Sequence, residues 1–198
     1  MLRRRLRAEG VLFRAYRCWS LAATWTRLPR RKDLAELEEL PSRAWIGVAE
    51  AQAASGLFRY RSLGSEMLRL GLPDTIGGSV GGATDPSPFG DLDRAAFLES
   101  AFQERIVFSR RQLAAPAGDP LRIDCLVLPL CAEQPGTAIV LFAQDFNHGQ
   151  DSRRRAAERP TGPIVETERL SLSAMDPAHE HQSSVWLAPS YAGQHHSR

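Results

Sequence analysis

Aromatic and charged residues alternate over Leu57 to Leu63, where the spacing of hydrophobic positions is clearest. Phe58 and Tyr60 fall on one side of this segment, and Arg59 and Arg61 fall on the other. Alternation with a period of two is typical of a strand with one face toward the core and one toward water. The segment therefore predicts a strand whose aromatic residues point inward.

Similar patterns predict four further strands, each bounded by turn-forming residues. They are expected over Ala44 to Val48, Val107 to Leu113, Leu121 to Leu130 and Thr137 to Phe146. The last two are apolar on both faces, so the sheet must be covered on both sides. We expect helices of the body to cover one side. The N-terminal helix, a second subunit or both are expected to cover the other.

Apolar residues spaced by three and four positions predict helices elsewhere. The longest helix of the body is expected from Asp91 to about Arg105. Its apolar face would consist of Ala95, Leu98, Phe102 and Ile106. A short helix is expected from Asp33 to Leu40. Another is expected between Ser65, which suits an N-cap, and Gly71, which suits the left-handed residue that ends a helix.

Residues 2 to about 27 predict a basic amphipathic helix. Its apolar face would carry Leu12, Tyr16, Trp19 and Ala23, and its cationic face Arg3, Arg7, Arg14 and Arg17. Three interpretations follow, of which packing of the apolar face on the sheet or on a second subunit is preferred. Binding to an anionic membrane surface is second. Nucleic-acid binding is third, because no reading helix accompanies the charge, and specific recognition is not expected.

The formal net charge of +2 is divided unevenly along the chain. Residues 1–32 carry a net +9, residues 33–149 carry −7, and the remainder is neutral. We therefore expect a basic N-terminal helix in residues 1–32 and one folded domain in residues 33–149. Residues 150–198 are polar and predict a disordered tail. Only Ile164-Val165 and Val185 to Leu187 could serve there as docking segments.

The order of the expected elements is two strands, short helices, a longer helix and three antiparallel strands. This order resembles a PAS domain, and more specifically the alphaproteobacterial PAS family whose members often stand alone. The resemblance covers roughly residues 20 to 147. Its motifs are Trp25, Leu28-Pro29-Arg30-Arg31 with Asp33, Phe58-Arg59-Tyr60-Arg61 with Leu63-Gly64, Gly77, and Leu126-Val127-Leu128-Pro129-Leu130. It implies an α+β fold, a PAS-like five-stranded antiparallel sheet with short helices on one face and an N-terminal helix.

Candidate chemistry is sparse in the expected domain. All five histidines lie at or beyond His148, so a haem held by an axial histidine and a catalytic triad are not expected. The histidines of the tail, including His179, His181, His195 and His196, are interpreted as solvated. Cys125 and Cys131 are interpreted as small buried hydrophobes, and no flavin-type cysteine motif is present. We expect no enzymatic activity and no metal site, and the sequence leaves the cofactor unknown.

The odd number of cysteines favours a reducing cytoplasm, and no apolar run is long enough to span a bilayer. The resemblance implies a bacterial sensor or interaction protein in signalling. It would bind a small apolar ligand in its core, or a protein partner or second copy through its sheet and N-terminal helix. The inward-facing candidates for a ligand pocket are Tyr60, Phe102, Cys125 and Val127. The alternative is a membrane-surface adaptor, peripheral at the inner membrane, that the basic helix anchors.

Overall fold

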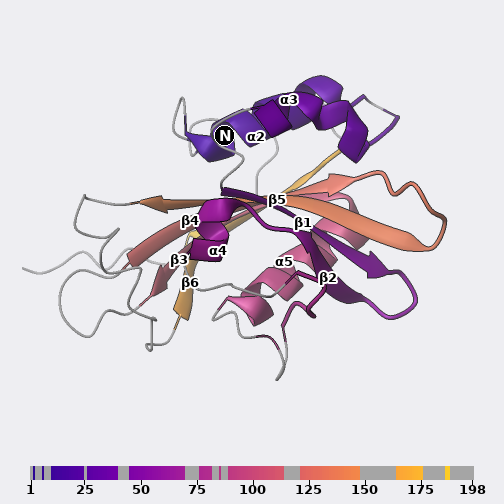
Figure 1. Ribbon diagram of the computed structural model, residues 1–198. Coiled ribbons are helices and arrows are strands. Elements are labelled where there is room, and N and C mark those ends of the chain that lie inside the picture. The colour runs from indigo at the N-terminus through magenta and orange to yellow at the C-terminus, as the bar shows by residue number, and fades with distance from the viewer. Residues whose placement is uncertain are drawn as a thin grey trace, which may run out of the picture.

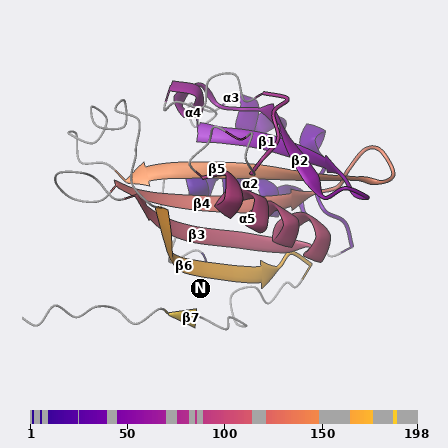
Figure 2. The same ribbon diagram turned by 90° about the horizontal axis from the view of Figure 1, so that it is seen from below.

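The chain forms an α+β fold in which one antiparallel sheet lies between two helical layers (Figure 1). The computed structural model describes residues 2, 6, 10–24, 26–39, 45–69, 76–81, 85, 89–113, 121–147, 164–175 and 186–187. The strands are hydrogen-bonded in the order β2-β1-β5-β4-β3-β6-β7. Figure 2 shows α5 crossing one face of this sheet.

Seven strands make up the described sheet, two more than the sequence predicted. They are β1 (Ile46–Gln52), β2 (Leu57–Ser62), β3 (Arg105–Leu113), β4 (Leu121–Leu130), β5 (Thr137–Asn147), β6 (Ile164–Ser173) and β7 (Trp186–Leu187). The five predicted strands are present with bounds within a few residues of those expected. Ala44, the expected start of the first strand, lies outside the described residues.

The expectation of a disordered tail was wrong for residues 164–173. These residues form β6, which pairs with β3 in an antiparallel ladder that joins Arg105 to Ser173 and Leu113 to Ile164. Leu170 and Leu172 of this strand are buried in the core beneath the N-terminal layer. The histidines expected to be solvated lie outside the described residues.

One helical layer consists of α2 (Val11–Ala22), the 3₁₀ helix η1 (Arg31–Leu34) and α3 (Ala35–Glu39). The predicted apolar face of α2 is directed at the sheet, where Leu12, Tyr16 and Trp19 are buried. The Trp19 Nε1–H group donates a 2.8 Å hydrogen bond to the carbonyl oxygen of Pro129 in β4. The expectation that both faces of the sheet are covered is thus confirmed within one chain. Arg3 and Arg7 lie outside the described residues.

The helices α4 (Ser65–Arg69) and α5 (Gly90–Gln103) follow β2 in the chain. The predicted apolar face of α5 was wrong by roughly half a turn. The helix instead buries Asp93, Ala96, Phe97 and Ser100. Ile106, expected on that helical face, belongs to β3 and is buried in the opposite core.

The outer edge of β2 is covered by residues 76–80. The N–H of Val80 donates to the carbonyl of Phe58 at 2.9 Å, and the N–H of Gly77 donates to the carbonyl of Tyr60 at 2.7 Å. Gly77 has a φ of 82°, which a residue with a side chain rarely adopts. The Phe58 motif and Gly77, which are apart in the sequence, therefore form one edge of the sheet. Gly71 lies outside the described residues.

Gly47 of β1 lies opposite Phe142 of β5, and the phenyl ring occupies the space above the glycine. A Cβ atom at position 47 would lie 2.4 Å from Cζ of Phe142, a ring that is 1% exposed.

Gly47→Ala is expected to lower the free energy of unfolding by about 1–3 kcal/mol, because the buried ring must move. Urea unfolding checks this. The control is Ala53→Gly, a substitution at an exposed position that changes backbone freedom alone. Gly136→Ala would be unsuitable as a control, because Gly136 has a positive φ. An unchanged midpoint for Gly47→Ala would contradict the expected close contact.

Candidate functional site

A group of buried polar side chains lies between α5 and the sheet, among apolar residues. We call it the polar layer. Its members are Asp93, Ser100, Ser109, Arg111 and Gln144, each at most 2% exposed. The two α5 residues face the sheet, while the others lie on the side of β3 and β5 that carries Val107 and Phe142 into the core beneath α5. Buried polar groups are costly unless they are paired, so this layer is the strongest candidate site.

Arg111 and Asp93 form a buried ion pair that joins β3 to α5. Nη1 of Arg111 lies 2.5 Å from Oδ1 of Asp93, and Nε donates to Oγ of Ser109 at 3.2 Å. The remaining nitrogen, Nη2, has no hydrogen-bond partner among the described residues. The guanidinium is therefore held in place on one side and has a free donor on the other.

Burial and mutual attraction have opposite effects on the charges of this ion pair. It raises the pKa of Asp93, although Arg111 opposes the shift, and the neighbouring carboxylate of Asp85 raises that pKa further. Burial also disfavours the charge on Arg111, but Asp93 more than offsets this effect and leaves the arginine pKa raised. Tyr60 lies close enough to lower the pKa of Asp93. We expect the pair to stay charged because each member stabilises the other's charge.

Gln144 contributes both a donor and an acceptor to the polar layer. It is 1% exposed, and neither Nε2 nor Oε1 has a hydrogen-bond partner among the described residues. In the sheet it lies opposite Cys125, which in turn lies opposite Ser109. Oγ of Ser100 is likewise buried without a described partner. The layer thus presents an amide, a hydroxyl and a guanidinium nitrogen whose hydrogen-bonding capacity is unused within the described chain.

The structure places three of the four pocket candidates beside this layer. Tyr60, Cys125 and Val127 are buried in the core beneath α5. Phe102 was wrongly expected to face inward: it is 44% exposed, because the face of α5 directed at the sheet is the one that carries Asp93 and Phe97.

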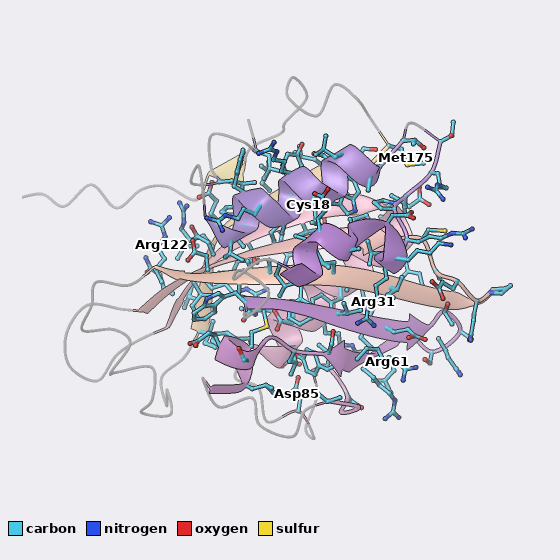
Figure 3. The ribbon with its side chains drawn as sticks, turned by 45° about the horizontal axis from the view of Figure 1, so that its top comes forward. Cys18, Arg31, Arg61, Asp85, Arg122 and Met175 are labelled. Atoms are coloured by element: carbon cyan, nitrogen blue, oxygen red, sulfur yellow. The ribbon has the colours of Figure 1, made fainter. Side chains whose placement is uncertain are left out.

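The interpretation of Cys125 as a small buried residue is confirmed. Its side chain is fully buried, and burial raises the pKa of the thiol to about 12. A thiol with such a pKa is protonated at neutral pH and unreactive as a nucleophile. Cys131 is only half-buried at the end of β4, and Cys18 is half-buried on α2 (Figure 3). All three are free cysteines.

A second cluster of charges lies at the far end of the sheet, on the face that α2 covers. Arg110 makes two hydrogen bonds to Asp124, of 2.9 and 3.2 Å, and a third of 2.8 Å to Glu168. Burial opposes ionisation of Asp124, but hydrogen bonds from Arg110 and Arg122 outweigh it and lower its pKa. The cluster is internally paired and ties β6 to β3 and β4. We interpret it as structural.

The motif Leu28-Pro29-Arg30-Arg31 with Asp33, which belongs to the family resemblance, also has a structural role. The carbonyl oxygen of Pro29 accepts a 2.9 Å hydrogen bond from the N–H of Cys131, which joins the N-terminal layer to the end of β4. Oδ2 of Asp33 accepts from the N–H of Arg30 at 2.9 Å and caps η1. Trp25 lies outside the described residues.

A separate cavity of about 90 Å³ lies on the opposite face of the sheet, between the η1–α3 segment and strands β1, β2 and β5. Its lining consists of Arg31, Leu34, Leu37, Ile46, Val48, Ser62, Leu63, Gly64 and Leu141. The cavity and the polar layer are therefore on different sides of the sheet. The sequence offered no signal for it, because its lining comes from five elements.

Sequence reasoning missed Asp93, Arg111 and Gln144 as site residues. A single signal was present: Arg111 and Gln144 interrupt strands at positions where the alternation requires an apolar residue. Asp93 lies in the first turn of α5, where a carboxylate also favours the helix dipole, so its position in the sequence has an ordinary explanation. Its carboxylate points to the sheet, where it meets Arg111.

Within the described residues, no group of histidine, cysteine or acidic side chains could hold a metal ion. Nor does the described part of the chain contain a helix long and apolar enough to cross a membrane. The fold and the polar layer define an α+β protein with a buried hydrogen-bonding site. No protein-family model matches the chain, and no curated protein or solved structure is significantly similar to it.

Proposed function

We propose that this protein is a non-enzymatic, PAS-like signalling protein that binds a small ligand in the polar layer and passes the signal to a partner. The observation that carries the proposal is Gln144, a buried amide whose two polar atoms have no hydrogen-bond partner among the described residues. An unpaired buried polar group costs about 1–3 kcal/mol. A ligand that pairs with these atoms would remove that cost.

The order of elements supports the PAS-like part of the proposal. Two strands, β1 and β2, are followed by α4 and α5 and then by three neighbouring antiparallel strands. The family resemblance implied this order. The strand β6 is an addition to it and pairs with β3 in the same sheet.

The chemistry of the polar layer supports a ligand with hydrogen-bonding groups rather than the purely apolar ligand expected from the sequence. Gln144 offers one donor and one acceptor side by side, and Nη2 of Arg111 offers a further donor. Arg111 is already neutralised by Asp93, so the ligand need not be an anion. Phe97 and Phe142, whose ring centroids lie 4.9 Å apart, supply apolar contact area nearby.

A substitution at Gln144 tests the proposal. If the amide is kept for a ligand, Gln144→Leu should raise the unfolding free energy of the ligand-free protein by about 1–3 kcal/mol, because an unpaired amide is removed. Any small molecule that native mass spectrometry detects on the wild-type protein should be lost. Gln112→Leu, an exposed glutamine on β3, is the control and should change neither property.

Destabilisation by Gln144→Leu would contradict the proposal, since it would mean that the amide is already satisfied in the protein. A wild-type protein with no bound molecule, and with no thermal shift across a metabolite panel, would also count against ligand binding. In that case the protein would act through contact with a protein partner or a second copy of the chain. The proposed location is the cytoplasm.

The membrane-surface adaptor has less support. Peripheral helices insert their apolar face into the membrane interface, whereas the apolar face of α2 is buried on the sheet. Leu21 lies on the opposite side of α2 and is 73% exposed. Membrane binding would require α2 to leave the sheet and break the hydrogen bond from Trp19 to Pro129.

A further inference from the structure

The polar layer continues toward the surface along one row of the sheet. The row consists of four residues that lie directly opposite one another on successive strands: Gln144 of β5, Cys125 of β4, Ser109 of β3 and Arg169 of β6. The row is roughly 14 Å long, since neighbouring strands lie about 4.8 Å apart. The two residues in its middle, Ser109 and Cys125, have small side chains. A track with little side-chain bulk therefore leads from the buried amide to β6.

The exposure of polar side chains increases in the same direction. Arg111 and Gln144 are at most 1% exposed, whereas the side chains of Glu166 and Arg169 on β6 are 20% and 28% exposed. Toward β1 and β2, the core beneath α5 is instead closed by buried aromatic side chains. Figure 2 shows β6 beside β3, on the side of the sheet away from β1 and β2. Solvent therefore comes closest to the polar layer at the boundary between α5 and β6.

Two ion pairs of Arg169 close this boundary. Nη1 of Arg169 donates to Oε2 of Glu99 on α5 at 2.8 Å, and Nε donates to Oε2 of Glu166 at 2.9 Å. The second oxygen of Glu166, Oε1, is buried without a hydrogen-bond partner among the described residues. Arg169 thus joins β6 to α5 across the end of the row. Behind it, Glu166 adds an unused acceptor to the polar layer.

An irregularity in β6 places both of these side chains on the α5 side. Residues three apart in a regular strand point to opposite faces of the sheet. The ladder between β3 and β6 shifts register between Arg110 and Arg111, which makes Thr167 an extra residue in β6. The bulge brings Glu166 and Arg169 to one face, where they form their ion pair. Bulges are common beside functional sites, where they redirect a side chain.

We propose that the boundary between α5 and β6 is the entrance to the polar layer, and that Arg169, with Glu99 and Glu166, forms a gate across it. The purpose of this gate rests on the proposed ligand site, whereas its opening is a property of the protein alone. Half-exposed ion pairs are weak, so Arg169 can move away without unfolding of the chain. The acceptor on Glu166 favours a ligand that carries an N–H or O–H donor.

The reaction of Cys125 with a thiol reagent measures this opening without any ligand. In the background Cys18→Ser with Cys131→Ser, Cys125 is the one remaining thiol. The closed protein protects it, because the side chain is fully buried and burial raises the pKa of the thiol to about 12. Arg169→Gln should raise the rate of reaction with methyl methanethiosulfonate about three- to tenfold under native conditions, because both ion pairs are lost.

A second variant and a control make the result specific. Glu99→Gln, which weakens the gate from the α5 side, should raise the rate in the same way. Arg122→Gln is the control and should leave the rate unchanged, because Arg122 is a partly exposed arginine that pairs with Asp124 on the opposite face of the sheet.

Salt should also open the gate. When Arg169 is present, the rate should rise as the salt concentration increases from about 0.05 M to about 0.5 M, because salt weakens ion pairs that solvent reaches. Arg169→Gln should remove most of this dependence.

Urea unfolding of each variant distinguishes opening of the gate from unfolding of the whole protein. The entrance is overturned if Cys125 reacts only as fast as global unfolding allows, or if Arg169→Gln and Arg122→Gln accelerate the reaction equally. Failure of the ligand site would give a different result. Gln144→Leu would then destabilise the ligand-free protein, while Arg169→Gln would still accelerate the reaction of Cys125.

Discussion

Replacing Arg111 by leucine is expected to lower the free energy of unfolding at neutral pH by about 3–5 kcal/mol. The substitution leaves the carboxylate of Asp93, which is 2% exposed, without the cation that it contacts at 2.5 Å. Urea unfolding at pH 7.5 measures the loss. Arg61→Leu is the matched control: Arg61 also pairs with a carboxylate, but Arg61 is exposed and its partner Glu50 is only half-buried, so we expect little change.

The same variant should show a characteristic dependence on pH. Without Arg111, burial keeps the pKa of Asp93 well above the ordinary value of 3.8. A carboxyl group whose pKa is raised by folding favours the folded state at low pH and loses that contribution as the pH rises through its folded pKa. The destabilisation by Arg111→Leu should therefore shrink as the pH falls from 7.5 toward 4. A loss independent of pH would contradict the assignment of Asp93 as the stranded charge.

A double variant distinguishes the effect of the two charges on stability from the effect of side-chain packing. Replacing both Asp93 and Arg111 by leucine removes both charges, so stability should recover to within about 1.5 kcal/mol of the wild type or exceed it. If the double variant is as unstable as Arg111→Leu, the arginine would be needed for packing rather than for charge.

Trp19→Ala is the second substitution expected to have a large effect, a loss of about 3–5 kcal/mol. Trp19 is 1% exposed beneath α2 and donates its indole hydrogen bond to the carbonyl of Pro129. Thermal unfolding followed by circular dichroism measures the loss. Leu21→Ala is the control on the same helix, because Leu21 is 73% exposed and should matter by less than about 0.5 kcal/mol.

This experiment also bears on the membrane alternative. If α2 left the sheet in solution, Trp19→Ala would leave the stability of the body unchanged and reduce binding to anionic vesicles. If α2 covers the sheet, the substitution lowers stability, and the intact protein does not float with such vesicles. Measuring both stability and vesicle binding therefore distinguishes the two positions of α2.

Regular patterns made much of the fold predictable. The bounds of β4 agree with the predicted Leu121 to Leu130, and the two apolar faces of β4 and β5 required cover on both sides. The face of α5 could not be predicted, because the helix buries Asp93 and Ser100 instead of a continuous apolar stripe. Only the tertiary contact with Arg111 makes Asp93 an interior residue.

The strand β6 was missed for a related reason. Leu170 and Leu172 alternate with polar residues, which is a strand signal, but Glu166, Glu168 and Arg169 precede them in a polar segment. Those charges are paired in the fold: Glu168 contacts Arg110 at 2.8 Å, and Arg169 contacts Glu99 of α5 at 2.8 Å. Composition alone therefore favoured a tail, whereas the partners that make this segment a strand lie far away in the chain.

The position of β6 has a consequence for how the protein is made. The side chain of Arg105 contacts Ser171, 66 residues later, and the indole of Trp19 reaches Pro129, 110 residues later. Contacts between such distant segments slow folding, because long loops must close before the contacts can form. While the chain is being synthesised, the edge of β3 that pairs with β6 stays unpaired until residues 164–173 have been made. During that interval the growing chain presents an open strand edge, the state in which chaperone binding would protect it from aggregation.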